Sequence, residues 1–506
     1  MSEAPPPGYL GADARIRTGP SLEMVRAGYE LELADADILH HGLGLADIAH
    51  VIALAEHAVI DRDEAAALLS ALLELDRMAP SELEIDSRYG DLVNVREHWL
   101  LDRVGPAAGW LSAGRPRREA GRIAFRLALR EQLLDLAEGA LRFGFALHAF
   151  ADRERATLMP DYTYVVAAQP TTAGHWALSF VAPTIRDLQR LRADLAFVDA
   201  SPAGTGGVNG SRLSVDRARL AALLGFAGQI ANTRDAMWQT DGFADLTSHA
   251  AIAAVGASRF AEDVELYCTS EFGLLRIGDE HCRASALMPH KRNPYSLVVL
   301  RGGASTLIGR STGVLASQRT LSGQTDNLLH AYGEVTRSVS HAARLLELAG
   351  AVAETLELDA GAAEQALRSG FTQATDLADM IARETDLDYR SAYRIVGNAV
   401  AYITDRGGGP ERLTARQLDA CARLVVGHPL ELDPAVVAEA LDPVSAIATR
   451  IVDGGAAPAP MARMLADDLA ALEHASEWIT AARMRIIAAR NALLGLAEER
   501  SQPIHK

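Results

Sequence analysis

The feature that most constrains the fold is a long stretch without proline, between Pro116 and Pro160. Within it Leu127, Leu134 and Leu141 repeat every seven residues, a spacing that places an apolar stripe on one side of a helix. At ~1.5 Å per residue, such a helix would span about 60 Å. Few globular helices are that long, so the stretch predicts a bundle of long helices.

The remaining sequence also favours helix, and we predict an all-α fold. Aromatic residues, from which strands are often built, make up 5% of the chain. Apolar periodicity predicts further helices over 34–78 (two, broken near Asp61), 176–198, 216–272, 294–318 and 328–358, with a loop-rich segment over 80–115. We divide the chain into an N-terminal helical domain (1–112, with 1–20 expected to be disordered), a central long-helix bundle (113–365) and a C-terminal helical domain (366–506).

Charge and cysteine content exclude several classes of protein. The chain has 49 Lys and Arg against 66 Asp and Glu, a net charge of −17 that disfavours nucleic acid as a partner. Cys268, Cys282 and Cys421 show no paired spacing, which predicts reduced thiols in a cytoplasmic protein and no zinc site. The N-terminus does not resemble a signal peptide, and we expect no stretch near the ~20 apolar residues of a membrane span.

Residues 284–296 place a hydroxyl, two cations and an amide between two apolar helical runs, on Ser285, Lys291, Arg292 and Asn293. Two prolines in the segment predict a loop, with a helix beginning near the second proline. On these residues alone, either an anion-wrapping loop or a solvated helix connection is possible. The Gly-rich segment 201–210 lacks the lysine and the preceding strand of a phosphate-binding loop, so we interpret it as a structural turn.

Together with two other polar turns, this segment resembles the signature regions of the fumarase/aspartase superfamily, and most closely its argininosuccinate lyase branch. Residues 284–294 match the family's Gly-Ser-Ser-x-Met-Pro-x-Lys-x-Asn-Pro in register. Residues 160–170 resemble Pro-Gly-Tyr-Thr-His-x-Gln-x-Ala-Gln-Pro, and 114–119 resemble Gly-Arg-Ser-Arg-Asn-Asp. Matches at 374–379 and 441–450 are similar to the argininosuccinate lyase branch in particular, so the chain is identified as a divergent member of it.

The resemblance implies a three-domain lyase fold that needs neither cofactor nor metal. Its long helices would form a 20-helix core in a homotetramer, with each active site drawn from three chains. The substrate would be a small dicarboxylate. The reaction removes a proton beside a carboxylate and expels an amine to give fumarate, through a doubly charged intermediate that the site has to stabilise.

The resemblance also implies roles for individual residues. Ser285 would be the base, its alkoxide held by loop N–H groups and by Lys291. Lys291 and Asn293 would hold one substrate carboxylate and Arg117 the other, while Thr163 would help to deliver a proton to the leaving nitrogen. The alternative without a catalytic role is that Ser285 caps a helix and that the cations are ordinary surface residues. The other residues carried over are Tyr164 as catalytic and Arg115, Arg118, Met288, Gln169, Thr325 and His330 as substrate-binding.

Departures from the family pattern fall on the side of the site that meets the amine. Tyr164 replaces a family His, and Val298 replaces the Glu that pairs with it, so both ends of one polar pair are gone together. In the first region Pro116, Arg118 and Glu119 replace Ser, Asn and Asp, and Arg118 offers a stronger anion contact than an amide.

Other departures touch the amine subsite and the mobile loop. In an ungapped alignment Thr325, His330 and Gly333 stand where the family has Tyr, Gln and Lys. Ala284 and Ala286 replace a Gly and a Ser of the loop, which is expected to restrict its closure.

These observations favour a lyase that eliminates an amine, reversibly, from an N-substituted aspartate in specialised metabolism. A true argininosuccinate lyase of arginine biosynthesis is one alternative. A non-catalytic paralogue is another, supported by Tyr164 and Val298 and opposed by the intact Ser285 and Lys291. A metalloenzyme, suggested only by residues 280–282, is a third. His175 is interpreted as a structural histidine, with a proton role through Tyr164 left open.

Overall fold

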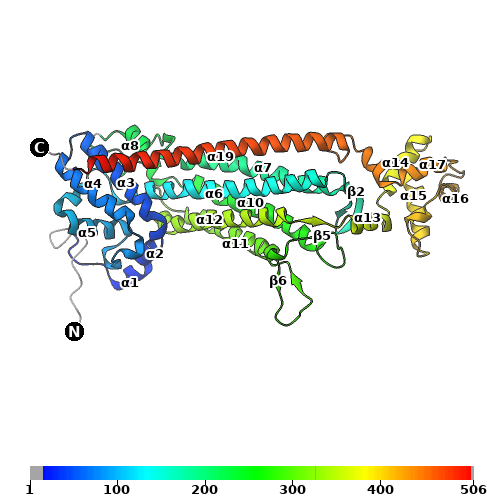
Figure 1. Cartoon of the computed structure of the whole chain (residues 1–506), viewed down its shortest axis with the longest axis horizontal. Helices are drawn as coiled ribbons and strands as arrows, with labels where there is room; N and C mark the ends of the chain where they lie inside the picture. Colours follow the sequence, from blue (N-terminus) through cyan, green and yellow to red (C-terminus); the bar gives the residue numbers. More distant parts are fainter. Residues whose placement is uncertain (1–14, 214, 325, 503–506) are drawn as a thin grey trace.

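The structure, a computed structural model, describes residues 15–213, 215–324 and 326–502. It is elongated, with a group of N-terminal helices at one end, long helices in the middle and a small helical group at the other end (Figure 1). The all-α prediction is confirmed, since the strands among the described residues form only short two-stranded pairs. Thr325 lies outside the described residues.

The N-terminal helices follow from local capping. Asp61 accepts hydrogen bonds from the amides of Asp63 and Glu64, at 2.8 and 3.0 Å, and so begins a helix at the predicted break. The segment expected to be loop-rich contains a 13-residue helix that the sequence analysis missed, capped by Asp91. The helices of this part are α1 (Leu22–Met24), α2 (Glu30–Leu33), α3 (Ala36–Glu56), α4 (Arg62–Arg77) and α5 (Leu92–Val104).

Helix α3 is the segment that comes nearest to a membrane span, which the sequence was not expected to contain. By length and composition it could cross a membrane, with a mean hydropathy of 1.5 over its most apolar window. However, 83% of that window is buried inside the protein, where α3 contacts α4 and α6. It is therefore a core helix, and its apolar residues extend around most of its circumference because neighbouring helices surround it.

The prediction of long bundle helices is confirmed. The proline-free stretch forms the 37-residue helix α6, which contacts α3, α7, α12 and α19. Five phenylalanines are almost fully buried in this bundle, at positions 125, 143, 150, 243 and 260. The helices of the central part are α6 (Arg117–Arg153), α7 (Ala173–Val198), α8 (Arg217–Leu223), α9 (Thr233–Trp238), α10 (Asp241–Tyr267), α11 (Tyr295–Ser317) and α12 (Asp326–Glu354).

Four strand pairs connect the helices. The strands are β1 (Leu158–Thr163) with β2 (Val166–Thr172), β3 (Ala200–Ser201) with β4 (Gly228–Gln229), β5 (Leu275–Arg276) with β8 (Glu357–Leu358), and β6 (Arg283–Ala284) with β7 (Arg292–Asn293). All are antiparallel except the pair β3–β4. Two of them, β1–β2 and β6–β7, carry predicted site residues.

The C-terminal part differs from the predicted division of the chain. A separate hydrophobic cluster covers residues 377–437, whereas the 43-residue helix α19 (Pro458–Arg500) returns along the bundle and packs into its main cluster (Figure 1). We therefore propose that the C-terminal unit ends near residue 457. Its helices are α14 (Ala374–Glu384), α15 (Tyr389–Thr404), α16 (Ala415–Val425), α17 (Pro434–Ala440) and α18 (Pro443–Ala448). Helix α13 (Ala360–Ser369) precedes this unit and packs into the main cluster through Ala363.

Close packing of α3 on α6 depends on Gly42. A Cβ there would lie 2.7 Å from Ala124 Cα and 2.8 Å from its carbonyl oxygen, so the two helices would have to separate. We expect Gly42→Ala to lower the free energy of unfolding by about 1–3 kcal/mol. Gly495 on α19 is the matched control, because a Cβ there meets nothing within 4 Å. Gly495→Ala should instead stabilise the protein by roughly 0.5–1 kcal/mol, and urea unfolding would compare both variants.

Asp187 on α7 makes stability depend on pH. Burial raises the pKa of its carboxyl to about 6, although Arg190, 2.6 Å away, acts in the opposite direction. Because the folded pKa lies above the unfolded value, this group favours folding below about pH 4 and loses that contribution as pH rises through 6. We expect Asp187→Asn to gain about 2 kcal/mol of stability relative to the wild type between pH 4 and pH 8.

The control for Asp187 is an exposed aspartate–arginine pair with the same spacing, Asp152 and Arg155, at 2.9 Å. In urea titrations across this range, Asp152→Asn should follow the wild type. A wild-type pH dependence unchanged by Asp187→Asn would contradict the assignment.

Candidate active site

The predicted anion loop projects from the side of the bundle as an extended turn (Figure 1). Its base is the strand pair β6–β7, in which Arg283 faces Asn293 and Ala284 faces Arg292. The Asn293 side-chain amide donates to the Arg283 carbonyl at 2.9 Å, and Arg292 forms an ion pair with Asp279 at 2.7 Å. The loop and the helix start near Pro294 are confirmed. In this structure the Asn293 amide and Arg292 hold the loop base.

Ser285 is not a helix cap but the acceptor of two loop amides. Its Oγ lies 3.0 Å from the Met288 amide nitrogen and 3.3 Å from that of Leu287. Contacts from the amides two and three residues further along the chain are those of a serine turn, and amides directed at an oxygen also favour its anionic form. Lys291 is exposed on the same loop.

The second region is the hairpin β1–β2, with Thr163 and Tyr164 at its tip. Thr163 pairs with Val166, leaving Tyr164 and Val165 as the two-residue turn. Both turn residues have positive φ, 53° and 60°, a conformation that suits glycine and asparagine and is rare for a β-branched residue. Tyr164 is 99% exposed. Such strain at a projecting tip is typical of functional sites.

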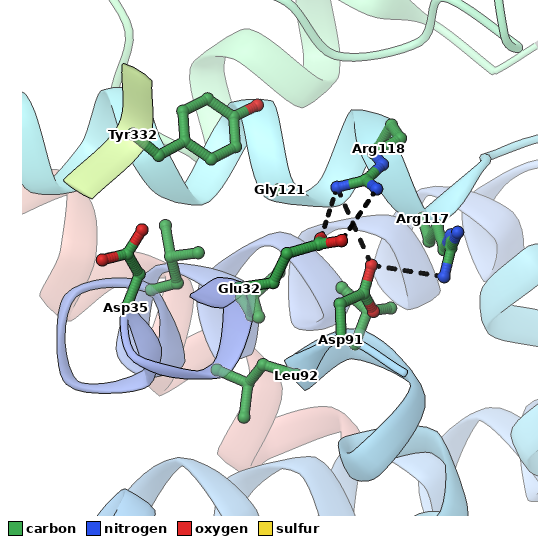
Figure 2. Close-up of a pocket in the computed structure, with 11 residues that line it drawn as sticks. Glu32, Asp35, Asp91, Leu92, Arg117, Arg118, Gly121 and Tyr332 are labelled. Atoms are coloured by element: carbon green, nitrogen blue, oxygen red, sulfur yellow. Dashed lines mark hydrogen bonds and ion pairs between the residues drawn. The ribbon is translucent and has the colours of Figure 1, made fainter. Parts of the chain in front are cut away.

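The first region surrounds a small cavity of about 40 Å³ at the start of α6 (Figure 2). Arg118 makes a bidentate contact with Glu32, at 2.6 and 3.2 Å, and Arg117 forms an ion pair with Asp91 at 3.4 Å. Each arginine predicted to hold a substrate carboxylate therefore faces a carboxylate of this chain. A substrate anion would have to compete with these two acids, which the sequence analysis did not identify.

Arg115 is less accessible than Arg117 and Arg118. It is buried and donates to Asp47 at 2.5 Å, and Asp47 also accepts from the buried Arg96 at 3.2 Å. One terminal nitrogen of Arg115, Nη1, has no partner, and the residue lines a cavity of 280 Å³. This nitrogen is itself buried, so a ligand could reach it only if the surrounding side chains moved.

The Gly-rich loop binds an internal carboxylate. Glu119, buried at the start of α6, accepts hydrogen bonds from the amides of Gly204 and Gly206 at 2.6 and 3.0 Å and from the Thr205 hydroxyl at 2.5 Å. Burial raises the pKa of Glu119, and these donors oppose the shift. The structural interpretation of residues 201–210 is thus confirmed, with Glu119 in the position that an anion would occupy.

Three more arginines continue from Arg118 along α6 at four-residue spacing, and the sequence analysis missed them. Arg126 donates to the carbonyls of Phe197 and Val198, whereas Arg130 pairs with Asp199 at 3.0 Å. The third, Arg122, is fully buried, and neither its Nε nor its Nη2 has a partner. The sequence does contain a signal for this row, an Arg at every fourth position. An exposed row of charged residues on a helix has the same spacing, so the pattern does not reveal that these arginines are buried.

The amine side of the predicted site is only partly described. His330 lies in α12, and its side chain is outside the described structure, as is Thr325. Gly333 leaves space for an ion pair, since a Cβ there would lie 2.3 Å from Arg337 and 2.4 Å from Asp35. Arg337 and Asp35 meet at 3.0 Å over this glycine. A partly exposed arginine of this chain, Arg337, thus lies next to the position where the family carries a lysine.

One chain does not bring the three regions together. Helix α6, about 55 Å long at 37 residues, separates Arg117 at its start from the hairpin that follows it. Figure 1 shows the N-terminal end of α6 and the hairpin at opposite ends of the bundle. No hydrogen bond or ion pair between the described residues joins any two of the three regions. Three further residues named in the sequence comparison are exposed at the surface: Met288, Gln169 and Val298.

Among the described residues, no group of three His, Cys, Asp or Glu side chains is arranged to hold a metal ion. Within residues 280–282, the His281 ring lies 3.2 Å from Ser296 Oγ and 3.1 Å from the Ala351 carbonyl. These contacts are those of a packed histidine. Cys268, Cys282 and Cys421 are free thiols.

A long-helix bundle with a serine loop and a projecting hairpin is the architecture of the fumarase/aspartase class of lyases. A lyase family model matches residues 35–309, and an argininosuccinate lyase C-terminal model matches 371–448. The chain therefore belongs to this lyase family, in its argininosuccinate lyase-like branch. It is a carbon–nitrogen lyase that releases fumarate.

Individual relatives agree with this assignment. The argininosuccinate lyase of Methanothrix thermoacetophila is 31% identical over 92% of this chain and 93% of its own length. That of Halobacterium salinarum is 34% identical over 83% and 85%. A crystal structure of EDDS lyase in complex with formate superposes with a TM-score of 0.85 at 25% identity, covering 96% of this chain and 97% of that one. A muconate lactonizing enzyme from Pseudomonas putida, 18% identical with a TM-score of 0.70, shares the fold.

Proposed function

We propose that this lyase cleaves an N-substituted aspartate whose amine differs from arginine, with Ser285 as the base. The observation that carries the proposal is the pair of loop amides, at 3.0 and 3.3 Å, directed at Ser285 Oγ. The likeness to EDDS lyase, which has also been solved with bound fumarate, supports an amine other than arginine. The altered amine side, with Tyr164, Val298 and Gly333, supports the same conclusion.

In this mechanism Ser285 takes the proton beside a substrate carboxylate held by Lys291 and Asn293. The electron pair passes into that carboxylate, giving a dianionic intermediate that nearby cations and amides stabilise. The carbon–nitrogen bond then breaks, the electron pair leaves with nitrogen, and fumarate forms. Thr163 and Tyr164 are proposed to guide a proton to the departing amine, and the reverse sequence adds an amine to fumarate.

A complete site in this proposal needs several chains. Because Arg117 and the hairpin lie at opposite ends of one bundle, antiparallel packing of copies would bring these ends together. Exposed apolar residues on α11, at 298, 299, 308 and 315, provide a face for that packing. We therefore propose a homotetramer with shared sites, which light scattering would test. Mixing inactive Ser285→Ala and Arg117→Ala chains should restore part of the activity if sites are shared.

The test of function is a fumarate-release screen. Purified protein is incubated with a panel of N-substituted aspartates that includes argininosuccinate, and fumarate is followed by its absorbance. We expect cleavage of at least one other compound at a higher kcat/KM than argininosuccinate. Preference for argininosuccinate would favour the arginine-biosynthetic alternative. Complete inactivity would favour a non-catalytic paralogue.

Cytoplasmic location belongs to the same proposal. It rests on the unpaired cysteines and on a substrate class drawn from amino-acid metabolism.

A further inference from the structure

The catalytic hairpin runs directly into helix α7, and the junction is fixed by side chains. Thr172 ends β2 and caps the helix, its Oγ1 accepting a hydrogen bond from the His175 amide at 3.1 Å. His175 thus lies in the first turn of α7, three residues beyond the strand. A hydrogen bond made by this ring therefore acts close to the base of the hairpin.

Both ring nitrogens of His175 are occupied. Nε2 lies 3.0 Å from the carbonyl oxygen of Gly454, and Nδ1 lies 3.2 Å from Thr171 Oγ1. Because a carbonyl oxygen only accepts, Nε2 carries the proton, and the Thr171 hydroxyl donates to Nδ1. The neutral ring satisfies both partners and leaves no nitrogen for proton transfer through Tyr164.

Gly454 belongs to the loop that leads from the C-terminal unit back to the bundle, between α18 and α19. Arg450 fixes the start of this loop by an ion pair with Asp376 of α14, at 2.5 Å. The Gly455 amide donates to the Val452 carbonyl at 2.9 Å, which closes the turn around Gly454. The two C-terminal segments that resemble argininosuccinate lyase, 374–379 and 441–450, therefore meet next to the His175 contact.

We infer that His175 is a positioning residue, which fixes the hairpin that carries Thr163 and Tyr164 to the C-terminal loop. A two-stranded hairpin is at best marginally stable alone, and this one has a strained tip at Tyr164 and Val165. Packing of the Tyr162 ring on Tyr267 and Phe272 holds one strand. The base adds further support, where β1 contacts α13 and β2 contacts α18. The His175–Gly454 hydrogen bond links the helix that follows the hairpin to the C-terminal loop, in addition to the backbone bonds from Ala173 to Thr157 and from Gly174 to Glu154.

The test compares His175→Phe, which keeps a ring but loses both hydrogen bonds, with His175→Gln, whose amide can still donate to Gly454. The matched control is His148→Phe. The His148 Nε2 lies 2.8 Å from the Leu465 carbonyl and likewise joins a bundle helix to a C-terminal segment, but this hydrogen bond includes neither the hairpin nor the loop of Gly454. Hydrogen exchange is measured on peptides covering residues 158–172 of the purified protein.

We expect exchange of the hairpin amides to be about five-fold faster in His175→Phe and near wild type in His175→Gln and His148→Phe. Equal hairpin exchange in His175→Phe and wild type would overturn the inference. So would equal acceleration in the two Phe variants.

The catalytic consequence rests on the proposed function and is measured separately. With a cleaved panel compound, kcat should fall about ten-fold in His175→Phe, with KM within two-fold, and recover in His175→Gln. It should stay unchanged in His148→Phe. A normal kcat in His175→Phe would overturn the positioning role. If wild type cleaves no compound, the proposed function fails, and the exchange result still decides whether His175 anchors the hairpin.

Discussion

Ser285→Ala should lower the rate of fumarate release by about 10²–10⁴-fold, the usual contribution of a general base. The loop should keep its fold, because the base of the loop is held by Asn293 and Arg292 rather than by the serine. The KM should change little, since Lys291 and Asn293 remain to bind the carboxylate. The measurement is fumarate absorbance at saturating concentration of the best panel substrate.

The control for this prediction removes a hydroxyl of similar local role elsewhere. Thr414 caps α16, its Oγ1 accepting from the Gln417 amide at 3.3 Å in the C-terminal unit. Thr414→Ala should leave kcat unchanged. A Ser285→Ala enzyme that retains more than a third of the wild-type rate would exclude the serine as the base and require a different proton acceptor.

The sequence predicted those helices whose start or length is determined by residues within or next to the helix itself. The length of α6 follows from an uninterrupted apolar stripe, the start of α4 from Asp61, and the start of α11 from Pro294. Helix α5 was missed because its 13 residues lie between the turn-like pairs Gly90-Asp91 and Gly105-Pro106, which made the whole segment resemble a loop. The return of α19 onto the bundle could not be predicted, since its apolar positions fit either cluster.

The sequence predicted which residues make up the candidate site, but not which residues their side chains contact. The loop that holds Ser285 and the turn that holds Thr163 were identified by motif, but the strands that make this turn a hairpin were not predicted. The carboxylates of this chain that pair with Arg118 and Arg115 could not be found in this way. Glu32 and Asp47 lie 86 and 68 residues from Arg118 and Arg115, so only the tertiary fold brings them together.

Asp199→Ala should be the most destabilising of these substitutions, lowering the free energy of unfolding by about 3–5 kcal/mol. Asp199 is 4% exposed, accepts from Arg130 at 3.0 Å and also binds Arg485, so it joins the end of α7 to α6 and α19. Burial already lowers the pKa of Arg130, and Asp199 opposes that shift. Without the carboxylate, Arg130 keeps its backbone acceptors at Leu224 and Gly225 but remains a buried cation with no counter-charge.

Urea unfolding of three variants would separate the loss of the pair from the loss of one partner. The exposed pair of Glu364 and Arg368, at 2.6 Å, is the control, and Glu364→Ala should change stability by less than about 0.5 kcal/mol. The double variant Asp199→Leu with Arg130→Met should be more stable than Asp199→Ala, because it removes the buried charge of Arg130 and leaves only the partly exposed Arg485 without the carboxylate. If the single and double variants lose the same free energy, the cost lies in packing around residue 199 and not in the stranded arginine.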